Sequence, residues 1–167
     1  MKMKWFKNFN SVLVFLNFIR NLELTFYKIT MNQKSKLYYR ELIYRVNGAA
    51  MEVHKELGPG LLESVYEKCL KIELKDWDIQ FVSQANIPVV YKNQLVDANL
   101  RCDLLVEDSL IVELKAVDQI LPIHAAQVIT YMKLLQLPIG LILNFNCTNL
   151  YKEGQKTFVN ELYRQLE

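Results

Sequence analysis

The run Ile139–Phe145 constrains the fold more than any other stretch of this sequence. It is almost wholly apolar and has the length of one strand, which predicts a central strand covered on both faces. With 167 residues, of which 51% are hydrophobic and 23% charged, the chain is long enough for one folded domain and too short for two ordinary ones. The other segments must therefore supply a sheet and the helices that cover it.

Three helices are predicted around this strand. Apolar residues at spacings of three and four predict a helix over 37–57, and Gly58-Pro59-Gly60 ends it. A second helix is predicted from Leu61 to about Lys75. The third is predicted over 122–137 and carries Pro122 in its first turn, where a missing N–H costs nothing.

Extended segments fill the stretches between the helices. We predict strands over 79–82, 87–91, 95–106, 110–117 and 139–145, with a further strand suggested over 149–152. Glu107-Asp108-Ser109 is a tight turn that makes a hairpin of the two strands around it. Pro88 indicates an edge position for the strand that it opens. The order α-α-β-β-β-α-β predicts an α/β domain with a mixed central sheet flanked by helices.

A charged pair interrupts one otherwise apolar strand. Alternation places Glu113 and Lys115 on one face and Leu114 on the other, and burying such charges is costly without a purpose or a partner. The hairpin brings Asp103 alongside, so that two carboxylates could share a hard cation such as Mg²⁺ or Mn²⁺. The alternative is a buried ion pair of Lys115 with either Glu113 or Asp103.

Other polar residues stand at helical spacing. Glu63 lies in the first turn of the second helix, where the positive helix start favours a carboxylate without any further role. Tyr66 follows it at three residues. Gln127 and Tyr131 show a four-residue spacing on the third helix, and the alternative there is the polar edge of an amphipathic helix.

Cysteines and charge limit the function classes. Cys69, Cys102 and Cys147 are far apart and form no CxxC pair, so neither a zinc knuckle nor a redox motif is indicated. An odd number of cysteines without a framework fits a reducing cytoplasm. Residues 1–30 carry a net charge of +4 and the remainder −2. Because the remainder has no general cationic surface, nucleic-acid contacts must come from a local patch or a bound metal.

Residues 1–30 also differ from the rest in composition. The apolar run Val12–Ile19 is too short to span a bilayer. Three interpretations remain open: a translated leader before a true start at Met31, an amphipathic N-terminal helix, or a signal peptide. We accordingly divide the chain into an N-terminal extension, 1–30, and a single domain, 31–167, and expect no membrane association. The sequence does not indicate an oligomeric state.

Four motifs together resemble a known family. The segment Gly60-Leu-Leu-Glu63-Ser-Val-Tyr66 matches the signature of the GxxExxY family, which is similar to the PD-(D/E)XK nuclease superfamily. Asp103 matches the aspartate of that superfamily, and Glu113-Leu-Lys115 matches its Glu-x-Lys element. Gln127-Val-Ile-Thr-Tyr131 resembles the Gln-x-x-x-Tyr element of the RecB-like branch. The resemblance covers roughly residues 37–152.

The resemblance implies a restriction-endonuclease-like core and Mg²⁺-dependent hydrolysis of phosphodiester bonds in DNA or RNA. It implies that Glu63, Asp103 and Glu113 hold the metal and that Lys115 assists the attacking water. Tyr66, Gln127 and Tyr131 would support the site or the substrate strand. The alternative function is that of a non-enzymatic interaction protein that retains the nuclease-like fold.

Overall fold

The computed structural model describes residues 34–167. The predictions for segment 1–30 and for a start at Met31 lie outside the described residues. Residues 36–167 form one compact unit. No helix within residues 34–167 has both the length and the apolar character needed to cross a membrane.

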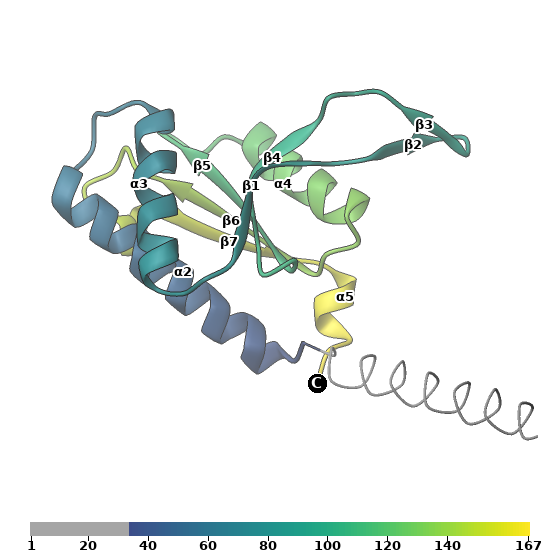
Figure 1. The fold of residues 1–167 in the computed structure, drawn as a ribbon, viewed down its shortest axis with the longest axis horizontal. Coiled ribbons are helices and arrows are strands. Elements are labelled where there is room, and N and C mark those ends of the chain that lie inside the picture. Colours follow the sequence, from purple (N-terminus) through teal and green to yellow (C-terminus); the bar gives the residue numbers. More distant parts are fainter. Residues whose placement is uncertain (1–33) are drawn as a thin grey trace, which may run out of the picture. The chain divides into compact units, whose positions relative to one another are not determined.

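The described residues form helices, a five-stranded sheet and a separate two-stranded sheet (Figure 1). The elements are α2 (Lys36–Leu57), α3 (Glu63–Asp76), β1 (Phe81–Asn86), β2 (Val89–Tyr91), β3 (Gln94–Val96), β4 (Arg101–Val106), β5 (Leu110–Lys115), α4 (Pro122–Leu134), β6 (Ile139–Asn144), the π-helical turn η1 (Leu150–Gly154), β7 (Gln155–Val159) and α5 (Glu161–Arg164). The large sheet has the order β1-β4-β5-β6-β7, and β2 pairs only with β3 among the described strands.

Strand β6 is the centre of the fold. All six of its residues are buried, and it pairs parallel with β5 and antiparallel with β7. The sheet is therefore mixed, and the predicted α/β domain with a mixed central sheet flanked by helices is confirmed. The apolar sequence of β6 follows from its position, because both of its faces are covered by helices.

Helices cover the two faces of the sheet (Figure 1). On one face, α2 and α3 pack against the even-numbered residues of β5, such as Val112 and Leu114. On the other face, Val128 and Met132 of α4 pack against Ile111 of β5. Glu113 and Lys115 share the alternation of Ile111, so β5 directs them toward the face that α4 covers.

The prediction of one strand over 95–106 is wrong. This stretch forms two strands, β3 and β4, separated by residues 97–100. Asn99 adopts a positive φ of 45°, which interrupts an extended backbone. As a result β2 and β3 form a hairpin that projects from the large sheet (Figure 1).

The C-terminal part also differs from the prediction. The strand suggested over 149–152 is wrong, since Leu150–Gly154 forms a π-helical turn, with the Asn149 side chain accepting from the Lys152 N–H at 3.0 Å. β7 was not predicted. It is an edge strand with mostly exposed or half-buried residues, and it therefore lacks the apolar pattern that identifies a buried strand.

A glycine sets the distance between β6 and α4. A Cβ atom added at Gly140 would overlap with Cγ1 of Val128 and lie 3.0 Å from Sδ of Met132. We expect Gly140→Ala to lower the free energy of unfolding by about 1–3 kcal/mol, because a methyl group forced into a packed core displaces its neighbours. Denaturant unfolding measures this change.

A double-mutant cycle provides the control for that prediction. Val128→Ala removes the nearest atom, so the double variant should lose less stability than the sum of the two single variants. Simple additivity would show that the contact between Gly140 and α4 does not determine the packing distance.

Candidate active site

The backbone pairing between β4 and β5 ends next to Asp103, whose side chain accepts a hydrogen bond in place of a backbone carbonyl. Backbone pairs join Leu104–Val106 to Leu110–Val112. Beyond them, the Leu114 N–H donates to Oδ2 of Asp103 at 2.8 Å, and the Asp103 N–H donates to Oε1 of Glu113 at 3.3 Å. Carboxylates thus replace backbone carbonyls as acceptors at the end of this ladder, and two acidic side chains meet there.

Glu113 is the most deeply buried acid of this group, with 2% of its surface exposed. Burial, followed by the Asp103 charge, raises its pKa to about 7, and Lys115 opposes the shift. Since a buried carboxylate beside a second carboxylate is unfavourable, Glu113 requires a proton or a cation. The hairpin thus places Asp103 beside Glu113, as the sequence predicted.

Lys115 supplies part of that positive charge. Its Nζ lies 3.3 Å from Oε2 of Glu113 and donates to the Leu114 carbonyl at 2.7 Å. The side chain is 12% exposed, so the ammonium group is held in place at the end of β5. The ion pair considered as an alternative is thus present, and it lies within the same acidic group.

Glu63 approaches this group from the first residue of α3. Burial raises the pKa of Glu63; Lys115 lowers it and Asp103 raises it. The backbone N–H of Ala116 also lowers the pKa of Glu63. The start of α3 and the end of β5 therefore bring Glu63 within electrostatic reach of both Asp103 and Lys115.

Tyr66 fixes the loop that leads to Glu63. Its hydroxyl donates to the Gly58 carbonyl at 2.6 Å and accepts from the Leu61 N–H at 3.1 Å. Its ring stacks on Phe145 with centroids 4.5 Å apart. Because Tyr66 is fully buried, this geometry favours support of the loop over contact with a substrate.

A second polar network adjoins Asp103, and its members were not among the predicted site residues. Gln84 donates to Oε2 of Glu67 at 3.2 Å and to Oδ1 of Asp103 at 3.4 Å. Burial alone would raise the pKa of Glu67, but hydrogen bonds from Ser83, Lys71 and Gln84 lower it. Glu67 follows Glu63 by four residues, a spacing visible in the sequence. Gln84 has a positive φ of 52°, which no sequence pattern indicates.

Gln127 and Tyr131 hydrogen-bond to each other, with Gln127 donating at 2.9 Å. Tyr131 is 6% exposed and belongs to the apolar cluster beneath α4. Among the hydrogen bonds of residues 34–167, none connects either side chain to the acidic residues. The structure places them on the helix that covers the face of Glu113 and Lys115, without a direct link to the site.

The donor set fits a hard divalent cation in its chemistry, since carboxylate oxygens are the preferred ligands of Mg²⁺ and Mn²⁺. Asp103 and Glu113 are already adjacent, and Glu113 is in need of positive charge. In their described positions, however, no three His, Cys, Asp or Glu side chains of residues 34–167 are arranged to hold a metal ion. A shared cation at Glu63, Asp103 and Glu113 therefore remains a prediction.

Comparison with known proteins agrees with this geometry. A family model described as the PD-(D/E)XK nuclease superfamily matches residues 40–158, a range that contains every predicted site residue. No curated protein and no solved structure gave a significant match. The GxxExxY family and the RecB-like branch stay predictions from the motifs.

The raised pKa of Glu113 predicts a pH-dependent stability. Between pH 4.5 and about 7 the folded state retains the Glu113 proton, whereas the unfolded state releases it. The free energy of unfolding should therefore fall as the pH rises through this window. We expect the melting temperature of the wild type, measured in EDTA, to fall relative to that of Glu113→Gln. A difference between the two proteins that is constant over this window would contradict the prediction.

Proposed function

We propose that this chain, which belongs to the PD-(D/E)XK nuclease superfamily, is a metal-dependent nuclease that hydrolyses phosphodiester bonds of DNA or RNA. One observation carries the proposal: the backbone pairing of β4 and β5 ends where Asp103, Glu113 and Lys115 meet. Glu63 approaches the same point from α3. Three acids and a lysine gathered around the end of β4 and β5 are better suited to phosphoryl chemistry than to packing in a hydrophobic core.

In this proposal Glu63, Asp103 and Glu113 hold Mg²⁺ or Mn²⁺. The bound ion would polarise a phosphoryl oxygen and lower the pKa of a water molecule. Support comes from the oxygen-only character of the donors and from the pKa of Glu113, which burial and then Asp103 raise to about 7. A divalent cation would relieve the repulsion between these acids.

Lys115 has the role of positioning the attacking water and stabilising negative charge on the phosphoryl group. Its ammonium group is fixed by Glu113 and by the Leu114 carbonyl. A preorganised cation needs no reorientation as charge develops, which is the main source of electrostatic catalysis. The compact ammonium charge of lysine suits this position.

Tyr66, Gln127 and Tyr131 act as supporting residues in the proposal. Tyr66 holds the loop before Glu63 through Gly58 and Leu61. The hydrogen bond between Gln127 and Tyr131 fixes the polar side of α4 above the strand that carries Glu113 and Lys115. Their contribution would be to orient the site or the substrate strand.

The three cysteines, Cys69, Cys102 and Cys147, are free in the structure, which suits a reducing compartment. We therefore place the enzyme in the cytoplasm, with nucleic acid as its substrate. The alternative function, a non-enzymatic interaction protein, is less well supported because such a protein has no need for Glu63, Asp103, Glu113 and Lys115 together.

Cleavage assays test the proposed activity. Purified protein with Mg²⁺ or Mn²⁺ should cleave at least one member of a panel of labelled single- and double-stranded DNA and RNA. Lys115→Ala should lower the rate by about 100-fold to 1,000-fold, because it removes one preorganised charge from the site.

Lys55→Ala is the matched control, since Lys55 is an exposed lysine of α2 paired with Glu52. Its rate should equal that of the wild type. The nuclease proposal fails if no substrate in the panel is cleaved faster by the wild type than by Lys115→Ala.

Thermal melts test the metal site separately from cleavage. Divalent metal should stabilise the wild type by about 2.7 kcal/mol when the free ion is at one hundred times its dissociation constant. Asp103→Asn and Glu113→Gln should abolish this effect, whereas Lys115→Ala should keep it.

A purely structural ion pair predicts the opposite pattern. In that case Lys115→Ala leaves buried carboxylates unpaired and costs roughly 3–5 kcal/mol, and the metal shifts no melt. Glu52→Gln serves as the control for loss of an acid, because Glu52 lies on the exposed surface of α2.

A further inference from the structure

The hairpin of β2 and β3 takes no part in the proposed nuclease site. We call residues 87–100 the arm. It leaves the five-stranded sheet after β1 and returns to it at β4 (Figure 1). Residues 90–99 are all exposed, and among the described strands β2 and β3 pair only with each other. Two short strands alone are marginally stable in water.

The arm exposes apolar side chains where solvent-facing strands usually carry polar ones. Val90 is 61% exposed and Leu95 is 75% exposed. These two residues are direct cross-strand partners, so both lie on the same face of the hairpin. An apolar pair at the centre of a projecting hairpin indicates a surface that a partner covers.

The charges of the arm argue against nucleic acid as that partner. Lys92 and Asp97 are its only charged residues, so its net charge is zero. A two-stranded ribbon can enter a nucleic-acid groove, but affinity for phosphates requires a cluster of basic residues. The composition of the arm therefore favours a protein partner.

The hydrogen-bonding edges of the arm are not equivalent. Lys92 and Asn93 form a two-residue turn in which both have positive φ. A turn of this kind makes its flanking pair, Tyr91 and Gln94, a hydrogen-bonded pair of the ladder. Alternation then directs the backbone groups of Leu95 and Asp97 to the free edge of β3. On the free edge of β2 the corresponding positions are Val90 and Pro88, and Pro88 has no N–H. The edge of β3 is thus the one suited to accept another strand.

A second copy of this chain is complementary to that edge. If two β3 strands pair antiparallel about Leu95, the row Val90–Leu95–Leu95–Val90 crosses four strands on one face. The same register places Asn93 opposite Asp97 of the second copy, with Lys92 beside it. The positive charge at the tip of each arm then meets the negative charge at the base of the other.

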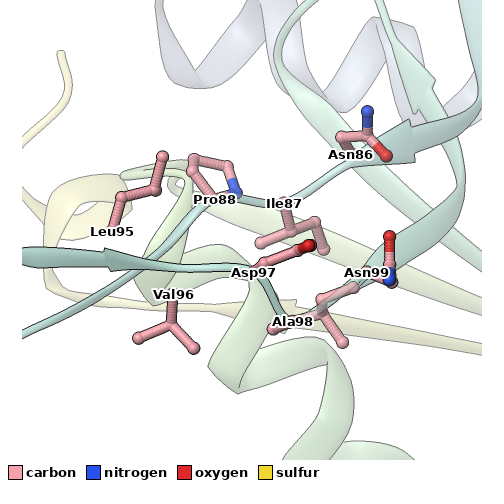
Figure 2. Close-up of a pocket in the computed structure, with 9 residues that line it drawn as sticks. Asn86, Ile87, Pro88, Leu95, Val96, Asp97, Ala98 and Asn99 are labelled. Carbon is pink, nitrogen blue, oxygen red and sulfur yellow. The ribbon is translucent and has the colours of Figure 1, made fainter.

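The base of the arm can receive such a tip. A pocket of about 370 Å³ lies between the segment that contains Ile87 and Pro88 and the segment from Leu95 to Leu100. Figure 2 shows Asp97 between these two segments, near Ile87. The pocket thus combines an apolar wall with one carboxylate, which suits a lysine at the end of an apolar strand.

We propose that the arm is a dimerisation element, in which the β3 strands of two copies of this chain pair antiparallel about Leu95. The inference rests on the register, exposure and charges of residues 87–100 and does not depend on nuclease activity. It makes the assembly a two-fold symmetric dimer, since the same edge is used by both copies.

Sedimentation equilibrium of the full chain across a wide range of concentration tests the proposal. The wild type should reach twice the mass of one chain. Leu95→Lys places two like charges opposite each other at the two-fold axis and should raise the dimer dissociation constant by at least about tenfold. Ile72→Lys, at an exposed position of α3 outside the arm, should leave the dissociation constant unchanged.

A charge exchange tests the antiparallel register. Lys92→Glu and Asp97→Lys should each weaken the dimer, and the double variant should restore it. A wild type that stays monomeric, or a dimer that Leu95→Lys does not weaken, overturns the proposal. So does a result in which the arm variants lose affinity for nucleic acid while their mass is unchanged, because that result assigns the arm to the substrate.

Discussion

The hydrogen bond from the Leu114 N–H to the Asp103 carboxylate is the interaction on which the site depends. In an uninterrupted antiparallel ladder this N–H would meet a backbone carbonyl of β4. Because a side chain takes that role, the pairing of the two strands ends without leaving a buried donor unsatisfied. The end of the ladder becomes a place where Asp103, Glu113 and Lys115 can meet in the interior of a folded domain.

Burial then determines the electrostatics of this place. Glu113 is almost completely enclosed, and burial, followed by the Asp103 charge, raises its pKa to about 7. Lys115 offsets part of that repulsion, while the Ala116 N–H and Lys115 do the same for Glu63. Such an arrangement is less stable than an apolar core of the same size. The large apolar cluster formed by α2, α3 and one face of the sheet provides the surrounding stability.

Much of this arrangement could be predicted from the sequence, because it follows from local periodicity. The apolar run at β6 predicted a central strand, and alternation in β5 predicted that Glu113 and Lys115 share a face. Other features depend on tertiary context. β7 lacks an apolar pattern because it lies at an edge, and the break at residues 97–100 depends on backbone conformation. Gln84 links Glu67 to Asp103 by hydrogen bonds, and it does so from an unusual positive φ.

The arm and the site are also connected through continuous backbone. β1 carries Ser83 and Gln84, which hydrogen-bond to Glu67, and β1 leads into the arm. The arm ends at β4, where Asp103 follows Arg101 by two residues. No glycine lies between Asn86 and Arg101 to act as a hinge. A movement of the arm relative to the sheet would therefore act first on β1 and β4, the strands that carry Gln84 and Asp103.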